Sequence, residues 1–197
     1  MKAIKVLGIS LLAATMLLAS HGEGKKESKK GQSEYKQVVH IGAQASKKLL
    51  KTLGGNLKKR MKKGGPADAL TFCAMNAADL TAKVDHELGK DVSIKRITLK
   101  PRNPANEAQG DEKAVLEALQ TLNQNHVKLP GHLIQKTADG YKYYKPLVIT
   151  KKVCLKCHGS NIDPKLKAQI DKHYPTDKAR GYKMGDLRGA IVVTIKK

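Results

Sequence analysis

Aromatic and acidic side chains are scarce in this sequence. Its 197 residues include no tryptophan and one phenylalanine, and 17 acidic residues stand against 38 basic ones, a formal net charge of +21. Most of the basic residues are lysine rather than arginine. Because nucleic-acid readers usually combine arginine with interleaved aromatic residues, this composition argues against a nucleic-acid partner. A lysine-rich surface suits an acidic redox partner protein or an anionic membrane surface instead.

Long apolar runs are missing except at the N-terminus. Lys2 and Lys5 precede an apolar stretch over residues 6–18, and small and polar residues follow over 19–22. This pattern is typical of a secretory signal peptide, and the stretch is short for a membrane span, although an uncleaved anchor stays an open alternative. We therefore expect a signal peptide at residues 1–22, a periplasmic mature protein and no membrane span after cleavage.

Cysteine is rare, and two of the three cysteines share one motif. The run from Cys154 through Cys157 to His158 reads CLKCH, a CxxCH motif, which is the attachment signature of a c-type haem. A zinc site would need further ligands at suitable spacing, and a thiol oxidoreductase would place its CxxC near a βαβ pattern, which is missing here. Haem c is assembled outside the cytoplasm, so the export signal supports the same interpretation.

The motif assigns a role to each of its chemical groups. We expect Cys154 and Cys157 to form thioether bonds to one covalent haem c, and His158 to be the proximal ligand of its iron. The ligand on the opposite side is open between water, no ligand and several side chains in the sequence: Cys73, Met75, Met184, His40, His86, His126, His132 and His173. Cys73 lies on the apolar stripe of a predicted helix, where a buried cysteine can also be merely a small hydrophobe.

The rest of the chain predicts an α+β domain. Residues 23–33 are charged and without apolar side chains, which predicts a disordered tether before a domain at 34–197. Apolar spacing predicts a helix or broken helix ended by Gly64 and Gly65, then a helix from Pro66 to Gly89, one around 115–122 and a short one at 164–172. Strands are expected at 92–99, 132–137, 141–150 and 190–195, the middle two joined as a hairpin. Strands dispersed among helices indicate an antiparallel sheet with flanking helices and a long N-terminal helical region.

Three stretches carry a family resemblance. They are KPRNPANEAQGDEKAVLEAL at 100–119, YYKPLVITKKVCLKCHG at 143–159 and YPTDKARGYKMGDLRGAIVV at 174–193. With these stretches and the Cys73 helix, the chain resembles the Tll-like haem-binding family of exported single-haem domains. The resemblance implies a PAS-like fold and a His and Cys axial pair, in which Cys73 is the distal ligand. Near the matching stretches, Arg96, Arg102 and Tyr174 are candidates for contacts with the haem propionates.

These observations favour a monohaem c-type cytochrome that works in one-electron transfer or redox sensing. The alternative is a haem-based sensor of a small ligand, which would act with a separate signalling partner. A haem peroxidase would need a distal acid-base residue near bound peroxide, and no histidine and arginine pair stands out for that role. We therefore do not expect an enzyme.

Overall fold

The computed structural model describes residues 23–197, and it describes side chains from residue 31 onward. The expected signal peptide at 1–22 lies outside the described residues. Residues 37–197 form one compact unit, and the residues before Gln37 belong to a separate unit. None of the described helices combines the length and apolar character that crossing a membrane requires.

The expected disordered tether at 23–33 is helical instead, because helix α1 (Glu23–His86) begins at Glu23. This expectation was wrong about local structure. The segment is rich in lysine and glutamate, which are good helix formers, and it contains no proline that would stop a helix growing from residue 34. High charge made the segment resemble a tether, but charge alone does not oppose helix formation.

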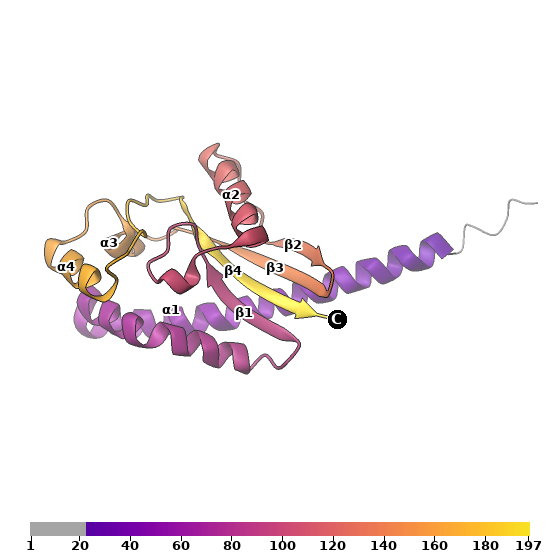
Figure 1. Cartoon of the computed structure of the whole chain (residues 1–197), viewed down its shortest axis with the longest axis horizontal. Helices are drawn as coiled ribbons and strands as arrows, with labels where there is room; N and C mark the ends of the chain where they lie inside the picture. The colour runs from indigo at the N-terminus through magenta and orange to yellow at the C-terminus, as the bar shows by residue number, and fades with distance from the viewer. Residues whose placement is uncertain (1–22) are drawn as a thin grey trace, which may run out of the picture. The chain divides into compact units, whose positions relative to one another are not determined.

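A bend at Gly64 and Gly65 divides α1 into two limbs. The backbone there leaves the helical region, with φ of +70° at Gly65, and Pro66 opens the second limb. A positive φ favours glycine, and proline suits the first turn of a helix, so the sequence places this bend. The first limb runs straight through Gly54 and Gly55, where the helix continues. Figure 1 shows the second limb returning toward β1.

The sheet has four antiparallel strands: β1 (Val92–Ile97), β2 (Leu133–Thr137), β3 (Gly140–Val148) and β4 (Leu187–Lys196). Their order in space is β1-β4-β3-β2, so the last strand along the chain lies between the first and the third. The hairpin from β2 to β3 turns at residues 138–139, as the sequence predicts.

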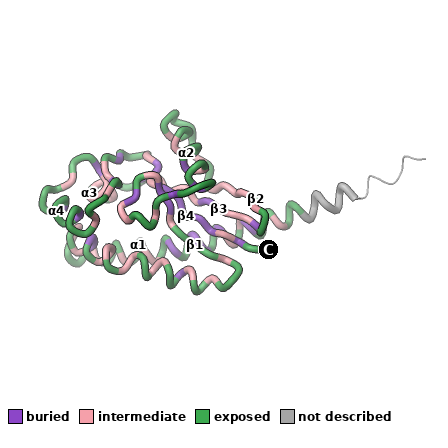
Figure 2. Tube along the Cα trace, in the orientation of Figure 1, coloured by how far each residue is buried: buried purple, intermediate pink, exposed green. Residues whose placement is uncertain are grey.

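Each face of the sheet is covered by a different helix. Both limbs of α1 pack on one face around Leu49 and Val84, against Ile191 and Val193. Helix α2 (Gly110–Gln124) packs on the other face, where Leu116 meets alternate residues of β4. Figure 2 shows the buried positions concentrated along the central strands.

One glycine allows the close approach of β4 to β1. Gly189 has φ of +153°, and a side-chain carbon there would lie 2.3 Å from the carbonyl oxygen of Ile97. Any larger residue would push the strands apart. This explains why the tail stretch needs glycine directly after Arg188.

The expected α+β class with an antiparallel sheet, flanking helices and a long N-terminal helix is confirmed. The helix predicted at 164–172 is α4 (Pro164–His173). The PAS-like detail of the fold stays a prediction.

Candidate functional site

The CxxCH motif directly follows the sheet. After β3, a 3-10 turn, η2 (Lys152–Cys154), leads into the one-turn helix α3 (Leu155–His158). Both motif cysteines are half-buried and form no disulfide with a described residue. One helical turn puts the two thiols and the imidazole on a short rigid segment, which is the spacing that attachment to a single porphyrin requires.

His158 is oriented through one of its ring nitrogens. Its Nδ1 lies 2.9 Å from the carbonyl oxygen of Ala179, and since a carbonyl only accepts, Nδ1 carries the proton. The other nitrogen, Nε2, then keeps its lone pair. Burial and the positive charges of Arg188 and Arg102 lower the pKa of His158 to about 3. The imidazole is therefore neutral at physiological pH, the state in which it binds a metal.

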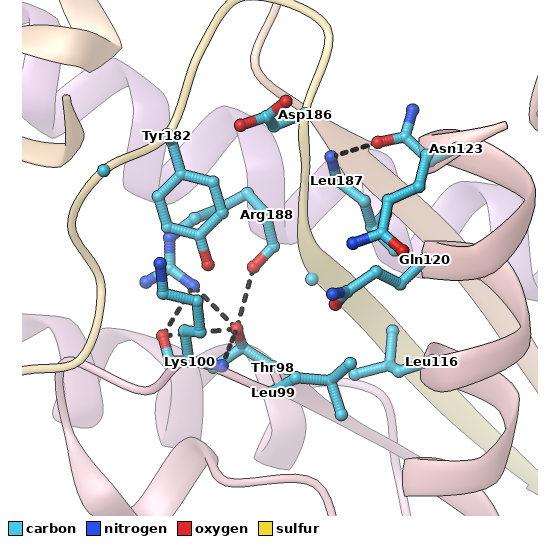
Figure 3. Close-up of a pocket in the computed structure, with 13 residues that line it drawn as sticks. Thr98, Leu99, Lys100, Leu116, Gln120, Asn123, Tyr182, Asp186, Leu187 and Arg188 are labelled. Atoms are coloured by element: carbon cyan, nitrogen blue, oxygen red, sulfur yellow. Dashed lines mark hydrogen bonds between the residues drawn. The ribbon is translucent and has the colours of Figure 1, made fainter. Parts of the chain in front are cut away.

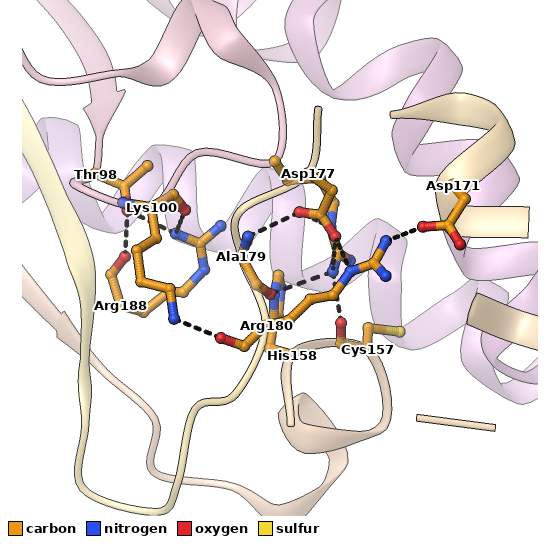
Figure 4. Close-up of polar contacts among 10 residues, drawn as sticks. Thr98, Lys100, Cys157, His158, Asp171, Asp177, Ala179, Arg180 and Arg188 are labelled. Atoms are coloured by element: carbon orange, nitrogen blue, oxygen red, sulfur yellow. Dashed lines mark hydrogen bonds and ion pairs between the residues drawn. The ribbon is translucent and has the colours of Figure 1, made fainter. Parts of the chain in front are cut away.

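A buried ion pair fixes the loop that holds His158. Arg102 Nε donates to Asp177 Oδ1 at 3.2 Å, and Arg102 Nη2 donates to the carbonyl oxygens of Cys157 at 2.5 Å and Ala179 at 3.3 Å. Asp177 is 1% exposed and also accepts from Arg180 Nε at 2.7 Å and from the backbone N–H of Ala179 at 2.9 Å. Figure 4 shows these contacts converging beside His158. We call Arg102, Asp177 and Ala179 the clamp.

Replacing Asp177 by asparagine should destabilise the protein by about 3 kcal/mol at neutral pH, because it leaves the mostly buried Arg102 charge without an anionic partner. Burial raises the pKa of Asp177, but hydrogen bonds from Arg102 and Arg180 outweigh burial, so the pKa lies below its usual value. The stability that this carboxylate adds is therefore complete above about pH 4 and lost as the pH falls through the folded-state pKa. Unfolding in guanidinium chloride at pH 7 and pH 3 measures the loss of stability and its dependence on pH.

Asp171→Asn is the matched control, because Asp171 also pairs with Arg180 but is 47% exposed. Solvent screens that pair, so the control should stay near wild-type stability. Equal losses for Asp171→Asn and Asp177→Asn, or an Asp177→Asn deficit that does not shrink at pH 3, would contradict the clamp.

The turn before η1 (Pro104–Asn106) positions Arg102. The side chain of Asn103 accepts the backbone N–H of Ala105 at 3.0 Å, and Pro104 opens the 3-10 turn. The turn then returns to the end of β1, where Thr98 N–H donates to the carbonyl of Asn106 at 2.9 Å. Asn103 and Pro104 thus shape this turn, and the turn fixes the position of Arg102.

The structure brings Cys73 to the motif from a distant part of the chain. The second limb of α1 packs through Leu70 against Leu166 and Ile170 of α4, and Cys157 contacts the same cluster. Cys73 lies one turn after Leu70 and is half-buried. Burial raises the pKa of its thiol, the charge of Arg96 lowers it, and the negative charge of Cys157 raises it, with a net increase. Since Leu70 and Cys157 belong to one packed cluster, the helix limb that carries Cys73 lies against the motif.

Two of the propionate candidates surround Cys73. Arg96, on β1, interacts electrostatically with both Cys73 and Tyr174, and burial lowers the pKa of its guanidinium. Its Nε is buried and has no hydrogen-bond partner among the described residues. A buried donor without an acceptor is costly, so this nitrogen suits an anionic group. The third candidate, Arg102, is in the clamp, and its contact with a propionate stays a prediction.

The other distal candidates lie away from this cluster. Met75 is 70% exposed and Met184 is 46% exposed. Four of the histidines are exposed, and the fifth, His132, stacks on Tyr143 at a centroid distance of 5.3 Å. Of the side chains considered from sequence, Cys73 is the one that the fold places at the motif.

A polar pocket of about 200 Å³ lies between the end of β1, helix α2 and the segment that leads into β4. Tyr182 meets the His158 ring edge-on at 6.2 Å, and Tyr182 and Arg188 both line the pocket. Figure 3 shows Gln120 and Asn123 of α2 facing them across it. Arg188 Nη1 donates to Thr98 Oγ1 at 2.8 Å, and no carboxylate among the described residues pairs with it.

Sequence reasoning missed Asp177, Arg188 and Tyr182 as site residues. All three occur in the quoted tail stretch, where Asp177 directly precedes Lys178 and is close to Arg180. These neighbouring bases were the available signal, since an acid among bases is a candidate ion-pair partner. Its partner Arg102 is distant in sequence, so the pairing needed the fold.

Comparison with known proteins agrees with this architecture. The family described as Tll0287-like matches residues 19–196. No curated protein matches the sequence. A solved structure titled "Crystal structure of the cyanobacterial heme-protein Tll0287" superposes with a TM-score of 0.56 at 23% identity, covering 84% of this chain and 96% of that one. At this identity the structural likeness supports the fold, whereas the family match extends over nearly the whole sequence. The chain therefore belongs to the Tll0287-like family.

Proposed function

We propose that this protein is a periplasmic monohaem c-type cytochrome that serves one-electron transfer or redox sensing and is not an enzyme. One covalent haem c would be held by thioether bonds from Cys154 and Cys157. The family membership and the haem protein among its structural relatives support the choice of cofactor. The expected signal peptide supports the location.

The observation that carries this proposal is that the α1 limb with Cys73 packs against α3, which carries Cys157 and His158. Leu70, one turn before Cys73 on α1, shares a packed cluster with Cys157 of the motif, while the motif imidazole presents an unprotonated Nε2. Thiolate and neutral imidazole are both ligands of haem iron. The buried Nε of Arg96 has no hydrogen-bond partner among the described residues. It would suit haem, because haem carries anionic propionates that accept hydrogen bonds.

Bound haem would supply an iron that exchanges single electrons between its ferric and ferrous states. The residues of the chain around the iron would set its reduction potential. His158 is oriented by Ala179 and held neutral by burial. The raised pKa of the Cys73 thiol means that only a strong electrostatic partner keeps it ionised, and coordination to a metal provides one. A thiolate favours the ferric state and so a low reduction potential.

A second candidate function is sensing of a small ligand, which the polar pocket beside His158 favours. A ligand that contacts Arg188 or Tyr182 would act on the His158 ring through the edge contact between the two rings. Small polar molecules with an acceptor group suit the buried guanidinium of Arg188. An acidic redox partner, in contrast, would use the lysine-rich exterior.

Absorption spectra of the purified exported protein in both oxidation states test the proposal. We expect a haem that stays with the polypeptide after denaturation, and rapid reduction by a chemical donor without turnover of peroxide. A colourless protein from a host that assembles cytochrome c would contradict the haem assignment. Sustained peroxide turnover would show an enzyme, and a reversible spectral change with a gas at physiological concentration would favour the sensor.

A further inference from the structure

The outer face of the first limb of α1 has an unusual charge pattern. Between Glu34 and Asp68 the sequence contains no acidic residue, while it contains eight lysines and Arg60. Arg60 and Lys48 pair with acids that lie outside this stretch, Asp68 and Glu87. The other lysines form no ion pair with a described residue, and a solvated cation stripe of this length attracts an extended anionic surface.

Four of these lysines form one stripe along the helix. They are separated by intervals of four, seven and four residues, which places them within a narrow sector of the helical surface. All four are exposed, and the set, called here the basic stripe, consists of Lys47, Lys51, Lys58 and Lys62. The stripe covers about 23 Å of helix at 1.5 Å per residue.

An exposed apolar stripe runs beside the basic one. Leu50 and Leu57, seven residues apart on the same side of the helix, are each 42% exposed. Gly54 lies between them with open space where a side chain would point. The helical spacing places Leu50 next to Lys47 and Lys51, so the apolar and charged positions form one continuous face.

A groove of about 520 Å³ adjoins the two stripes. Its walls come from α1 and β3, and it is lined by Ala43, Ser46, Lys47, Leu50, Lys51, Tyr143 and Lys145. Ser46 is 2% exposed, and its hydroxyl has no hydrogen-bond partner among the described residues. The groove therefore combines an apolar lining with lysine ammonium groups at its rim and a hydroxyl that lacks a partner.

We propose that this face of α1 binds the surface of an anionic lipid bilayer. Lysines beside exposed leucines on one helix are typical of helices that lie in a membrane interface, where ammonium groups meet phosphates and leucines enter the acyl boundary. Protein interfaces, in contrast, are enriched in arginine and aromatic residues and depleted in lysine. The groove beside Leu50 would take an acyl chain whose headgroup phosphate meets Lys47, Lys51 or Lys145.

Co-sedimentation with vesicles of known composition tests this proposal with the haem-loaded protein. The wild type should bind vesicles of phosphatidylglycerol and phosphatidylcholine and should not bind phosphatidylcholine alone. Each lysine close to an anionic surface strengthens binding about five-fold. Changing all four basic-stripe residues to glutamine should therefore weaken binding more than about 100-fold, while the haem spectrum and thermal unfolding stay as in the wild type.

The matched control removes four exposed lysines elsewhere: Lys128, Lys136, Lys165 and Lys172, each changed to glutamine. It has the same net charge as the stripe variant and should keep most of the binding. Equal loss in both variants would overturn the proposal, because net charge alone would then explain the attraction. Absence of wild-type binding to anionic vesicles would overturn it as well.

A second pair of variants tests the apolar contribution. Leu50→Gln with Leu57→Gln should weaken vesicle binding about ten-fold at high salt, where the charges are screened. Leu122→Gln with Val127→Gln, at positions 40% and 48% exposed, should have no effect. If the leucine variant binds vesicles normally and the wild type binds soluble polyglutamate as tightly as vesicles, the face fits an acidic protein and the lipid proposal fails.

Discussion

Changing Cys154 and Cys157 together to serine should abolish covalent haem completely. A serine hydroxyl does not add to a porphyrin vinyl group as a thiol does, so no thioether forms even if haem enters the site. Each single variant keeps one cysteine and should carry haem through one bond at reduced yield. Intact-mass measurement of the denatured, purified protein distinguishes these products, since covalent haem adds its mass to the chain and non-covalent haem is lost.

Cys73→Ser is the control for this experiment, because it removes a thiol from the same site without touching the motif. It should carry a full complement of covalent haem. Haem attached to the double variant, or lost from the control, would show that attachment does not depend on the motif in the way proposed. The two single variants, the double variant and the control together thus separate attachment from ligation.

Changing Cys73 to alanine should change the spectrum of the ferric haem and raise its reduction potential. A thiolate brings a full negative charge to the iron, and the identity of the axial ligands moves haem potentials over a range of about 0.8 V. Loss of this ligand should therefore raise the potential by about 0.1 V or more. Electron paramagnetic resonance of the ferric protein and a potentiometric titration measure the two effects.

Met75→Ala is the matched control for Cys73→Ala. Met75 lies two residues further along the same helix limb and is 70% exposed, so its loss should change neither the spectrum nor the potential. If the ferric spectra of wild type and Cys73→Ala are identical, the sulfur is not on the iron. The distal position would then belong to water or to a ligand that the described cluster does not include.

The sequence predicted most elements of this fold because their local signals agree with their tertiary roles. Pro66 after two glycines marked the bend in α1, and the Asp139-Gly140 pair marked the hairpin. The prediction of a disordered tether at 23–33 was wrong because it rested on the charged composition and did not weigh the absence of proline. The strand order could not be predicted from the sequence, because no local signal indicates that β4 lies between β1 and β3.

The site was predictable to the extent that its residues adjoin one another in sequence. The CxxCH spacing alone identifies Cys154, Cys157 and His158 as site residues. Cys73 needed both helical periodicity and a family resemblance, and the structure adds that its helix limb packs against Cys157 through Leu70. The pairing of Arg102 with Asp177 joins two loops that lack periodicity, so only their contact in the folded chain reveals it.

The central position of β4 has a consequence for the order of maturation. β4 is the last strand along the chain, yet β1 joins the hairpin of β2 and β3 only through it. The segment just before β4 carries Ala179, whose carbonyl orients His158. On the proposed export route, the motif cysteines would leave the translocation channel before β4 does, and so before the sheet is complete. Enzymes that attach a porphyrin would meet an open, unstructured substrate, and closure of β4 would then lock the product in place.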